Sequence, residues 1–240
     1  MTQLDKYNQL ISQYEDMQYF TTDPLAVVKL LYTPHDIEIM AVVASWLAYG
    51  NRNQIFKKCN MALDIMQHQP YEYLKSGDWK AYKGSTQNFY RLFTYDDFYS
   101  LLNCLNSIYT QHSTLEEAIH HHLQLNPQAD YLDALIALLP TKGIPKDKSS
   151  ACKRLCLMLR WLIRQDSKVD IGLWKSFDQS KLLIPLDTHV WRIAHNEGLL
   201  TRSIADMKSV TELTTHCRSL FPHDPARMDF ALFGLGFFNK

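Results

Sequence analysis

The chain contains few helix-breaking residues and no recognisable export signal. Its 240 residues include 8 glycines and 9 prolines, and no alternating run rich in Val, Ile and Thr stands out. Scarce breakers and missing strand patterns favour helices over sheets. The first 14 residues are polar and lack the apolar core of a signal peptide, so we expect a cytoplasmic protein.

Cysteines and long apolar runs are also scarce. The chain has 5 cysteines, and an odd number without a secretion signal predicts reduced thiols. Cys152 and Cys156 lie four residues apart, but a zinc site needs two more ligands, and none has suitable spacing. The most apolar run, residues 39–48, is too short to cross a bilayer. We therefore expect no metal site and no membrane partner.

Net charge is also missing, which by itself argues against a nucleic-acid partner. The charges are nevertheless unevenly distributed. Residues 1–141 carry 9 Lys and Arg against 15 Asp and Glu, whereas residues 142–181 carry 10 against 4. Residues 182–240 carry 6 of each sign. The basic segment is either a solvated surface with chance clustering or a patch that faces phosphates, and the charges alone leave both interpretations open.

What the chain does contain is helical periodicity along most of its length. A helix over residues 37–49 is apolar nearly all round and should be central to the core. Residues 140–150 and 166–181 are expected to be irregular, with Ser149 or Ser150 capping the helix that follows. We predict an all-α fold with helices over residues 24–32, 37–49, 54–67, 71–74, 88–93, 96–110, 114–123, 130–139, 151–165, 187–196, 207–220 and 225–237.

The most informative segment is residues 184–194, Ile-Pro-Leu-Asp-Thr-His-Val-Trp-Arg-Ile-Ala. Apolar residues follow Asp187 at helical spacing, so Asp187 or Thr188 is a candidate helix N-cap, and an Asp here need do nothing else. The segment resembles the Val-Asp-Thr-His element of the helix-hairpin-helix DNA glycosylase superfamily, in which the Asp is the catalytic carboxylate. The resemblance implies two helical lobes that flank a cleft, one formed by residues 35–128 and the other by residues 1–34 plus 129–240.

The resemblance also implies a nucleophile. In the lyase members, a Lys in the first turn of the second hairpin helix attacks the sugar, and residues 131–139 and 151–165 would be the two helices here. Lys153 then takes that place, with Lys148 as the fallback, although a Lys in a first helical turn beside an Arg is usually a surface residue. The positive end of a helix dipole and neighbouring cations favour the neutral amine that such chemistry needs. Lys153 and Asp187 are therefore the candidate catalytic pair.

Two departures from the superfamily concern this hairpin. Its usual Leu-Pro-Gly-Val-Gly turn reads Leu-Pro-Thr-Lys-Gly at residues 139–143 and continues for several residues before the next helix. The 34 positions between Lys153 and Asp187 exceed the spacing in many members and resemble the archaeal 8-oxoguanine glycosylase branch. The resemblance implies DNA-backbone contacts from the remodelled turn and the start of the next helix: Lys142, Gly143, Lys146, Lys148 and Arg154.

Two further segments resemble base-binding elements of the superfamily. Residues 38–50 are similar to an early core helix, with Leu47 near the position of a Gln that contacts DNA, and Trp46 and Tyr49 are either base-pocket or core aromatics. Residues 228–233 are similar to an archaeal element in which an Asp reads the base edge and an aromatic residue stacks on it. Asp229 and Phe233 share one helix face at the required spacing, but Asp229 is equally a first-turn helix charge.

The resemblance covers residues 35–240, and it is closer still to an uncharacterised bacterial family attached to this superfamily. It implies a base-excision repair glycosylase with AP lyase activity, a monomer acting on double-stranded DNA with a damaged base such as an oxidised purine. An iron–sulfur cluster is not expected, because only Cys217 lies beyond Cys156. The alternatives are a non-catalytic nucleic-acid-binding protein of the same fold and a hydrolase of small N-glycosides.

Overall fold

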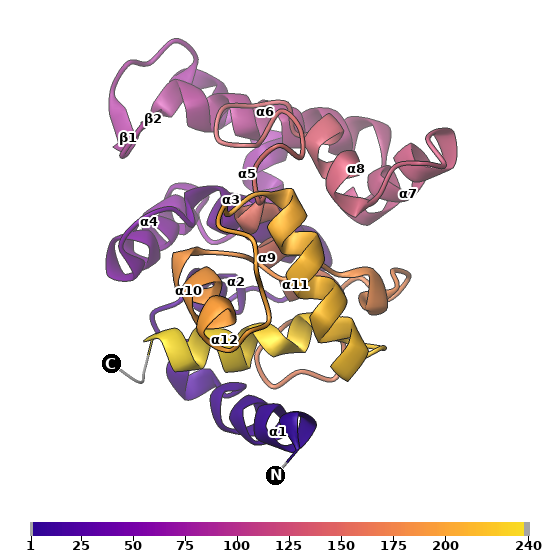
Figure 1. Cartoon of the computed structure of the whole chain (residues 1–240). Helices are drawn as coiled ribbons and strands as arrows, with labels where there is room; N and C mark the ends of the chain where they lie inside the picture. Colours follow the sequence, from indigo (N-terminus) through magenta and orange to yellow (C-terminus); the bar gives the residue numbers. More distant parts are fainter. Residues whose placement is uncertain (1, 238–240) are drawn as a thin grey trace. The chain divides into compact units, whose positions relative to one another are not determined.

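The computed structural model describes residues 2–237, which form two compact units (Figure 1). One unit combines the chain up to Thr21 with the chain from Lys148 onward, and the other is Thr22–Asp147. The all-α prediction is confirmed, because one small hairpin is the only sheet structure found within residues 2–237. None of the helices in this range is long and apolar enough to span a membrane.

The unit formed by Thr22–Asp147 is built around helix α3, whose residues 38–47 are all buried. Thr33 caps α3 by accepting a hydrogen bond from the Asp36 backbone N–H, with Pro34 in the first turn as predicted for a helix start. The α-helices of this unit are α2 (Pro24–Val28), α3 (Pro34–Leu47), α4 (Arg52–Ile65), α5 (Pro70–Ser76), α6 (Tyr95–Gln111), α7 (Leu115–Leu125) and α8 (Tyr131–Leu138).

The prediction of a helix over residues 88–93 is wrong. This segment forms an antiparallel hairpin of β1 (Asn88–Tyr90) and β2 (Phe93–Thr94). The chain reverses at Arg91, whose φ of +53° lies in the left-handed region, and the Asn88 side-chain amide donates to the Arg91 carbonyl oxygen at 2.9 Å. The segment is rich in aromatic residues, which suit strands, and Phe89 stacks on Phe98 with ring centroids 4.7 Å apart. Aromatic packing therefore decides the local structure here.

The other unit joins the two ends of the chain. Its α-helices are α1 (Gln3–Tyr14), α9 (Lys153–Ile163), α10 (Thr188–Asn196), α11 (Met207–Leu220) and α12 (Met228–Phe237). Helix α1 was not predicted, yet it buries Tyr7, Ile11 and Tyr14 at helical spacing, and it lies beside α12 in Figure 1. A Cβ at Gly234 of α12 would lie 2.2 Å from the Tyr14 ring, so only glycine permits this close approach.

Candidate catalytic pair on helices α9 and α10

Lys153 is the first residue of helix α9, as the sequence interpretation required, but the helix begins differently from the prediction. Cys152, not Ser149 or Ser150, is the N-cap, and its backbone has a φ of +46°. Its side chain forms no capping hydrogen bond to the helix; the Ser150 hydroxyl instead accepts from the Cys152 backbone N–H at 3.4 Å. A non-glycine residue in the left-handed region is strained, and such strain is concentrated at functional sites. The start of α9 is thus a strained helix end with a Lys in its first turn.

Asp187 is the N-cap of α10, and its two carboxylate oxygens have different partners. Oδ1 accepts hydrogen bonds from the backbone N–H groups of His189 and Val190, both at 2.9 Å. Oδ2 lies 4.0 Å from the Lys153 Nζ. The Lys153 and Asp187 side chains are 31 % and 23 % exposed, respectively. Capping therefore fixes the orientation of the carboxylate while one of its oxygens faces a solvent-accessible amine.

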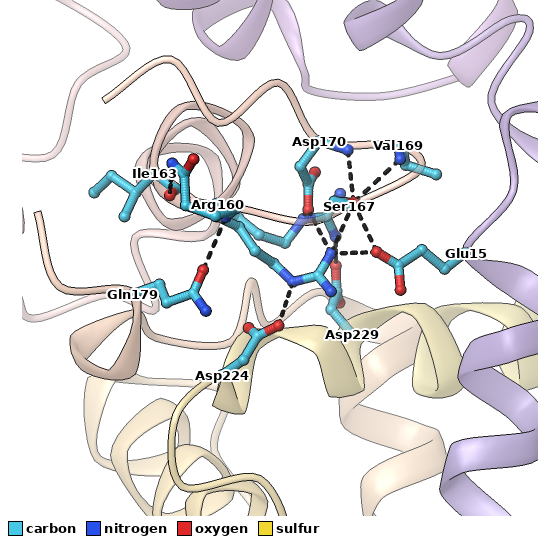
Figure 2. Close-up of polar contacts among 11 residues, drawn as sticks. Glu15, Arg160, Ile163, Ser167, Val169, Asp170, Gln179, Asp224 and Asp229 are labelled. Carbon is cyan, nitrogen blue, oxygen red and sulfur yellow. Dashed lines mark hydrogen bonds and ion pairs between the residues drawn. The ribbon is translucent and has the colours of Figure 1, made fainter. Parts of the chain in front are cut away.

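Farther along α9, two arginines are buried instead of facing phosphates. Arg160 and Arg164 were counted in the basic segment, and each has a side chain only 3 % exposed. The Arg164 guanidinium donates to Glu15, Asp170 and Asp224 at 2.6, 3.1 and 2.8 Å (Figure 2). This arrangement removes two of the ten cations of residues 142–181 from any surface patch.

The surrounding groups complete this buried network. The Ser167 hydroxyl donates to Glu15 at 2.7 Å and accepts from the Asp170 backbone N–H at 2.9 Å. Burial opposes the charged form of Arg164, but the facing carboxylates outweigh burial and raise its pKa. Burial likewise opposes the charged form of Glu15, yet the hydrogen bond and charge of Arg164 hold the pKa of that carboxyl below its usual range. Arg164 and Glu15 are therefore both charged and pair with each other.

Asp229, in the first turn of α12, connects this network to the candidate pair. Its carboxylate pairs with Arg160, which also donates to Asp170 at 3.2 Å, and Figure 2 shows Asp229 close to the arginine side chains. Burial raises the pKa of Asp229 to about 6 despite the opposing charge of Arg160. The charges of Asp187 and Lys153 also act on this pKa, the first raising it and the second lowering it. Asp229 is therefore electrostatically coupled to both.

Phe233, the predicted stacking partner of a base, lies one turn after Asp229 on α12 and is partly buried. Its ring stacks on Phe20 with centroids 6.4 Å apart, and Phe20 also makes an edge contact with Phe230. This aromatic cluster accounts for Phe233 as a packing residue without any ligand.

The two base-pocket candidates of the other unit differ in exposure. Trp46 is completely buried, and its ring stacks on Phe93 with ring centroids 4.0 Å apart. Its indole N–H donates to the Lys142 carbonyl oxygen at 2.8 Å. Its indole therefore has no exposed surface in this structure. Tyr49 is 53 % exposed, with the Arg91 guanidinium 5.3 Å from its ring centroid. Tyr49 thus offers an accessible aromatic face, whereas Trp46 acts as a core residue.

The predicted backbone contacts also fall into two groups. Lys142 is engaged within its own unit, since its amine donates to the Leu92 carbonyl oxygen at 2.6 Å and to Asp97 at 2.8 Å. Gly143 has a φ of +94°, and a Cβ there would lie 2.6 Å from the Trp46 indole nitrogen. Lys146 is exposed, and two further candidates, Lys148 and Arg154, are partly buried.

The sequence interpretation did not foresee the buried network of Arg160 and Arg164. The available signal was two arginines four residues apart on an amphipathic helix, next to Trp161 and flanked by apolar residues. Among residues 2–237, no cluster of three or more His, Cys, Asp or Glu side chains could hold a metal ion.

Comparison with known proteins identifies a family for the chain. The profile of a family described as "Protein of unknown function (DUF2400)" matches residues 23–238. Because this match spans most of the 240 residues, the chain belongs to that family. No curated protein and no solved structure matches the chain.

Proposed function

We propose that this DUF2400 member is a DNA repair glycosylase with AP lyase activity, in which Lys153 is the nucleophile and Asp187 the catalytic carboxylate. The observation that carries the proposal is the 4.0 Å separation of the Lys153 amine and the Asp187 carboxylate. The two residues are 34 positions apart, and the start of α9 and the start of α10 bring them together. Both side chains are partly exposed, as contact with a substrate requires.

The reaction follows from this pair. As the bond between C1′ and the base breaks, positive charge develops on the sugar, and the Asp187 carboxylate stabilises it. The neutral Lys153 amine forms a bond to C1′ while the base leaves with the electron pair and takes up a proton. Opening of the sugar ring then gives a Schiff base between Lys153 and C1′. Loss of a C2′ proton and cleavage of the C3′–O bond cut the strand.

The start of α9 favours this chemistry. The first-turn N–H groups of α9 receive no side-chain hydrogen bond from Cys152, and the helix dipole places positive charge beside the Lys153 amine. The Asp187 carboxylate lies 4.0 Å from the Lys153 amine, so it is positioned to accept the proton that the amine must lose.

The proposed substrate is double-stranded DNA with a damaged base, with an oxidised purine as the first choice. The partly buried Lys148 and Arg154, which belong to the same unit as the candidate pair, supply the cations for phosphate contacts.

Borohydride trapping tests the proposal. The protein is incubated with duplexes that contain an abasic site or 8-oxoguanine, because borohydride reduces a Schiff base to a stable covalent adduct. We expect an adduct with the wild type and none with Lys153→Gln. Lys208→Gln is the matched control, because Lys208 is exposed and, like Lys153, lies in the first turn of a helix. An adduct that persists in Lys153→Gln would contradict the assignment of the nucleophile.

The contribution of Asp187 is tested with Asp187→Asn. Asparagine caps helices as well as aspartate does, so the substitution removes the charge and keeps the cap. We expect the rate of base release to fall by about 100-fold or more. Asp206→Asn, at the N-cap of α11, is the matched control and should leave activity unchanged. Equal activity in Asp187→Asn and the wild type would show that Asp187 acts only as a helix cap.

Two results would favour the alternative functions. DNA binding that survives Asp187→Asn, with no product from any substrate, would indicate a non-catalytic binding protein. Cleavage of free nucleosides at a rate that does not depend on salt concentration would indicate a hydrolase of small N-glycosides, because phosphate contacts make DNA binding strongly salt-dependent.

A further inference from the structure

Helix α12 packs against two helices, and a glycine of α12 faces each of them. It contacts both α1 and α10 (Figure 1). A Cβ at Gly234 would lie 2.2 Å from the Tyr14 ring of α1. A Cβ at Gly236 would lie 3.1 Å from Cγ1 of Ile193 and 3.3 Å from Cβ of His189, both on α10. Two residues along a helix are about 200° apart around its axis, so the two glycines face opposite sides of α12.

The contact at Gly236 falls on the turn of α10 that holds the Asp187 carboxylate. The His189 backbone N–H donates to Asp187 Oδ1 at 2.9 Å, and the His189 carbonyl oxygen would lie 3.5 Å from a Cβ at Gly236. The Arg192 guanidinium, on the same helix, donates to the Gly236 carbonyl oxygen at 3.4 Å. A short series of contacts therefore leads from Gly236 through His189 to the carboxylate that faces Lys153.

We propose that Gly236 is a positioning residue of the candidate pair: because it has no side chain, the start of α10 lies close to α12 and holds the Asp187 carboxylate beside the Lys153 amine. The catalytic consequence of this inference rests on the proposed function. Glycine is unfavourable inside a helix, since it loses more conformational freedom on folding than any other residue. The close approach of α10 gives a reason for this glycine near the end of α12.

Helix α12 has no room to move away from α10. The buried ion pair of Asp229 with Arg160 fixes its start. On the side opposite α10, Gly234 already lies against the Tyr14 ring, so a retreat of α12 would press the two together. A Cβ at residue 236 must therefore displace the start of α10 instead. Reactions between two groups held in place are sensitive to such small displacements.

The first test needs no DNA. A carbodiimide joins a carboxylate and an amine that lie close together, without adding a spacer, and peptide mass spectrometry measures the yield. We expect the yield of the Lys153–Asp187 crosslink to fall by about 5-fold in Gly236→Ala. The Lys142–Asp97 pair, with a separation of 2.8 Å in the other unit, is the internal reference. An unchanged Lys153–Asp187 yield would overturn the proposal.

Gly198→Ala is the matched control for a general loss of stability. Gly198 follows the C-cap of α10, its φ is +70°, and a Cβ there would have no atom within 4 Å. Alanine at this position strains the backbone at the far end of α10 without pressing on its start. We expect the wild-type crosslink yield in this variant. An equal fall in Gly198→Ala and Gly236→Ala would mean that the crosslink reports only stability, and it would overturn the proposal.

A second substitution separates steric pressure from other effects of alanine. Ile193→Ala removes Cγ1, the atom nearest to a Cβ at Gly236. Substitutions at two residues in contact are not additive, so the double variant Gly236→Ala/Ile193→Ala should recover part of the crosslink yield that Gly236→Ala loses. A double variant with no recovery would overturn the steric explanation.

DNA is added last, as an abasic duplex with borohydride. The rate of adduct formation at saturating DNA should fall by about 10-fold in Gly236→Ala. The DNA concentration that gives half of this rate should not change, because α12 supplies none of the proposed phosphate contacts. An unchanged rate, or a fall caused by weaker DNA binding, would contradict the positioning role. If the wild type forms no adduct, the proposed function fails, and the crosslinking results still decide whether Gly236 positions the pair.

Discussion

Helix α9 carries two groups of charges on one face that differ in packing. At its start, the Lys153–Asp187 pair has a separation of 4.0 Å and side chains that are 31 % and 23 % exposed. Arg160, two turns later, and Arg164, the C-cap residue of α9, are each 3 % exposed and donate hydrogen bonds to several carboxylates. The buried group holds α1, α9 and the start of α12 together. The two side chains of the pair at the start of α9 make one loose contact with each other, and both are partly exposed.

The difference has a physical cause. A buried guanidinium is tolerated only when its donors are paired, so Arg160 and Arg164 demand a complete set of partners. The two guanidinium groups also lie over the Phe230 ring, at 4.4 and 5.1 Å from its centroid, which adds cation–π contact. Lys153 keeps contact with water and needs no such set. The three predictions below test this contrast by the free energy of unfolding.

The largest effect is expected from Arg164→Met. The substitution leaves the buried Glu15 carboxylate without its guanidinium partner and removes one of the two guanidinium partners of Asp170. Breaking a buried ion pair from one side costs about 3–5 kcal/mol. Urea denaturation at pH 7 measures the loss. A loss below about 1 kcal/mol would show that the buried network does not hold the fold.

The second effect is expected in the free energy of unfolding of Asp229→Asn, whose difference from the wild type should depend on pH. The pKa of Asp229 is raised from 3.8 to about 6 in the folded protein, so between these pH values the folded state binds more protons than the unfolded state. Wild-type stability therefore falls as pH rises from about 4 to 6, and this contribution is on the order of 3 kcal/mol. Asparagine does not titrate, so the stability of Asp229→Asn relative to the wild type should rise across the same window.

Denaturation of both proteins at several pH values from 4 to 7 gives this difference. A difference that is constant with pH would mean that the folded-state pKa of Asp229 is not raised. Asp178→Asn is a suitable control, since the Asp178 side chain hydrogen-bonds to Ser180 and its pKa is lowered instead.

The smallest effect is expected from Lys153→Gln, whose free energy of unfolding should differ from that of the wild type by less than about 1 kcal/mol. Partly exposed ion pairs contribute little because water screens them. The same substitution should abolish the borohydride adduct. A large loss of stability would mean that Lys153 belongs with the buried group and that the two ends of α9 do not differ in role.

The sequence predicted local helix starts better than tertiary surroundings. It placed Lys153 in a first helical turn and offered Asp187 or Thr188 as an N-cap, and the structure shows that Asp187 is the cap. The sequence allowed Trp46 to be either a core residue or a base-pocket residue, and its tertiary contacts show that it is a core residue. It assigned a helix to residues 88–93, where aromatic packing in three dimensions produces a hairpin.

The sequence by itself therefore determined the all-helical class and most helix positions, since a 3.6-residue period and a capping side chain are local signals. The candidate pair came from the resemblance and stays a prediction. Only the tertiary structure decided that the Lys153 amine and the Asp187 carboxylate meet across 34 positions, and that Arg160 and Arg164 are buried instead of exposed. Both outcomes depend on which helix faces pack together. That choice is made by the summed burial of side chains distant in sequence, and no single segment contains it.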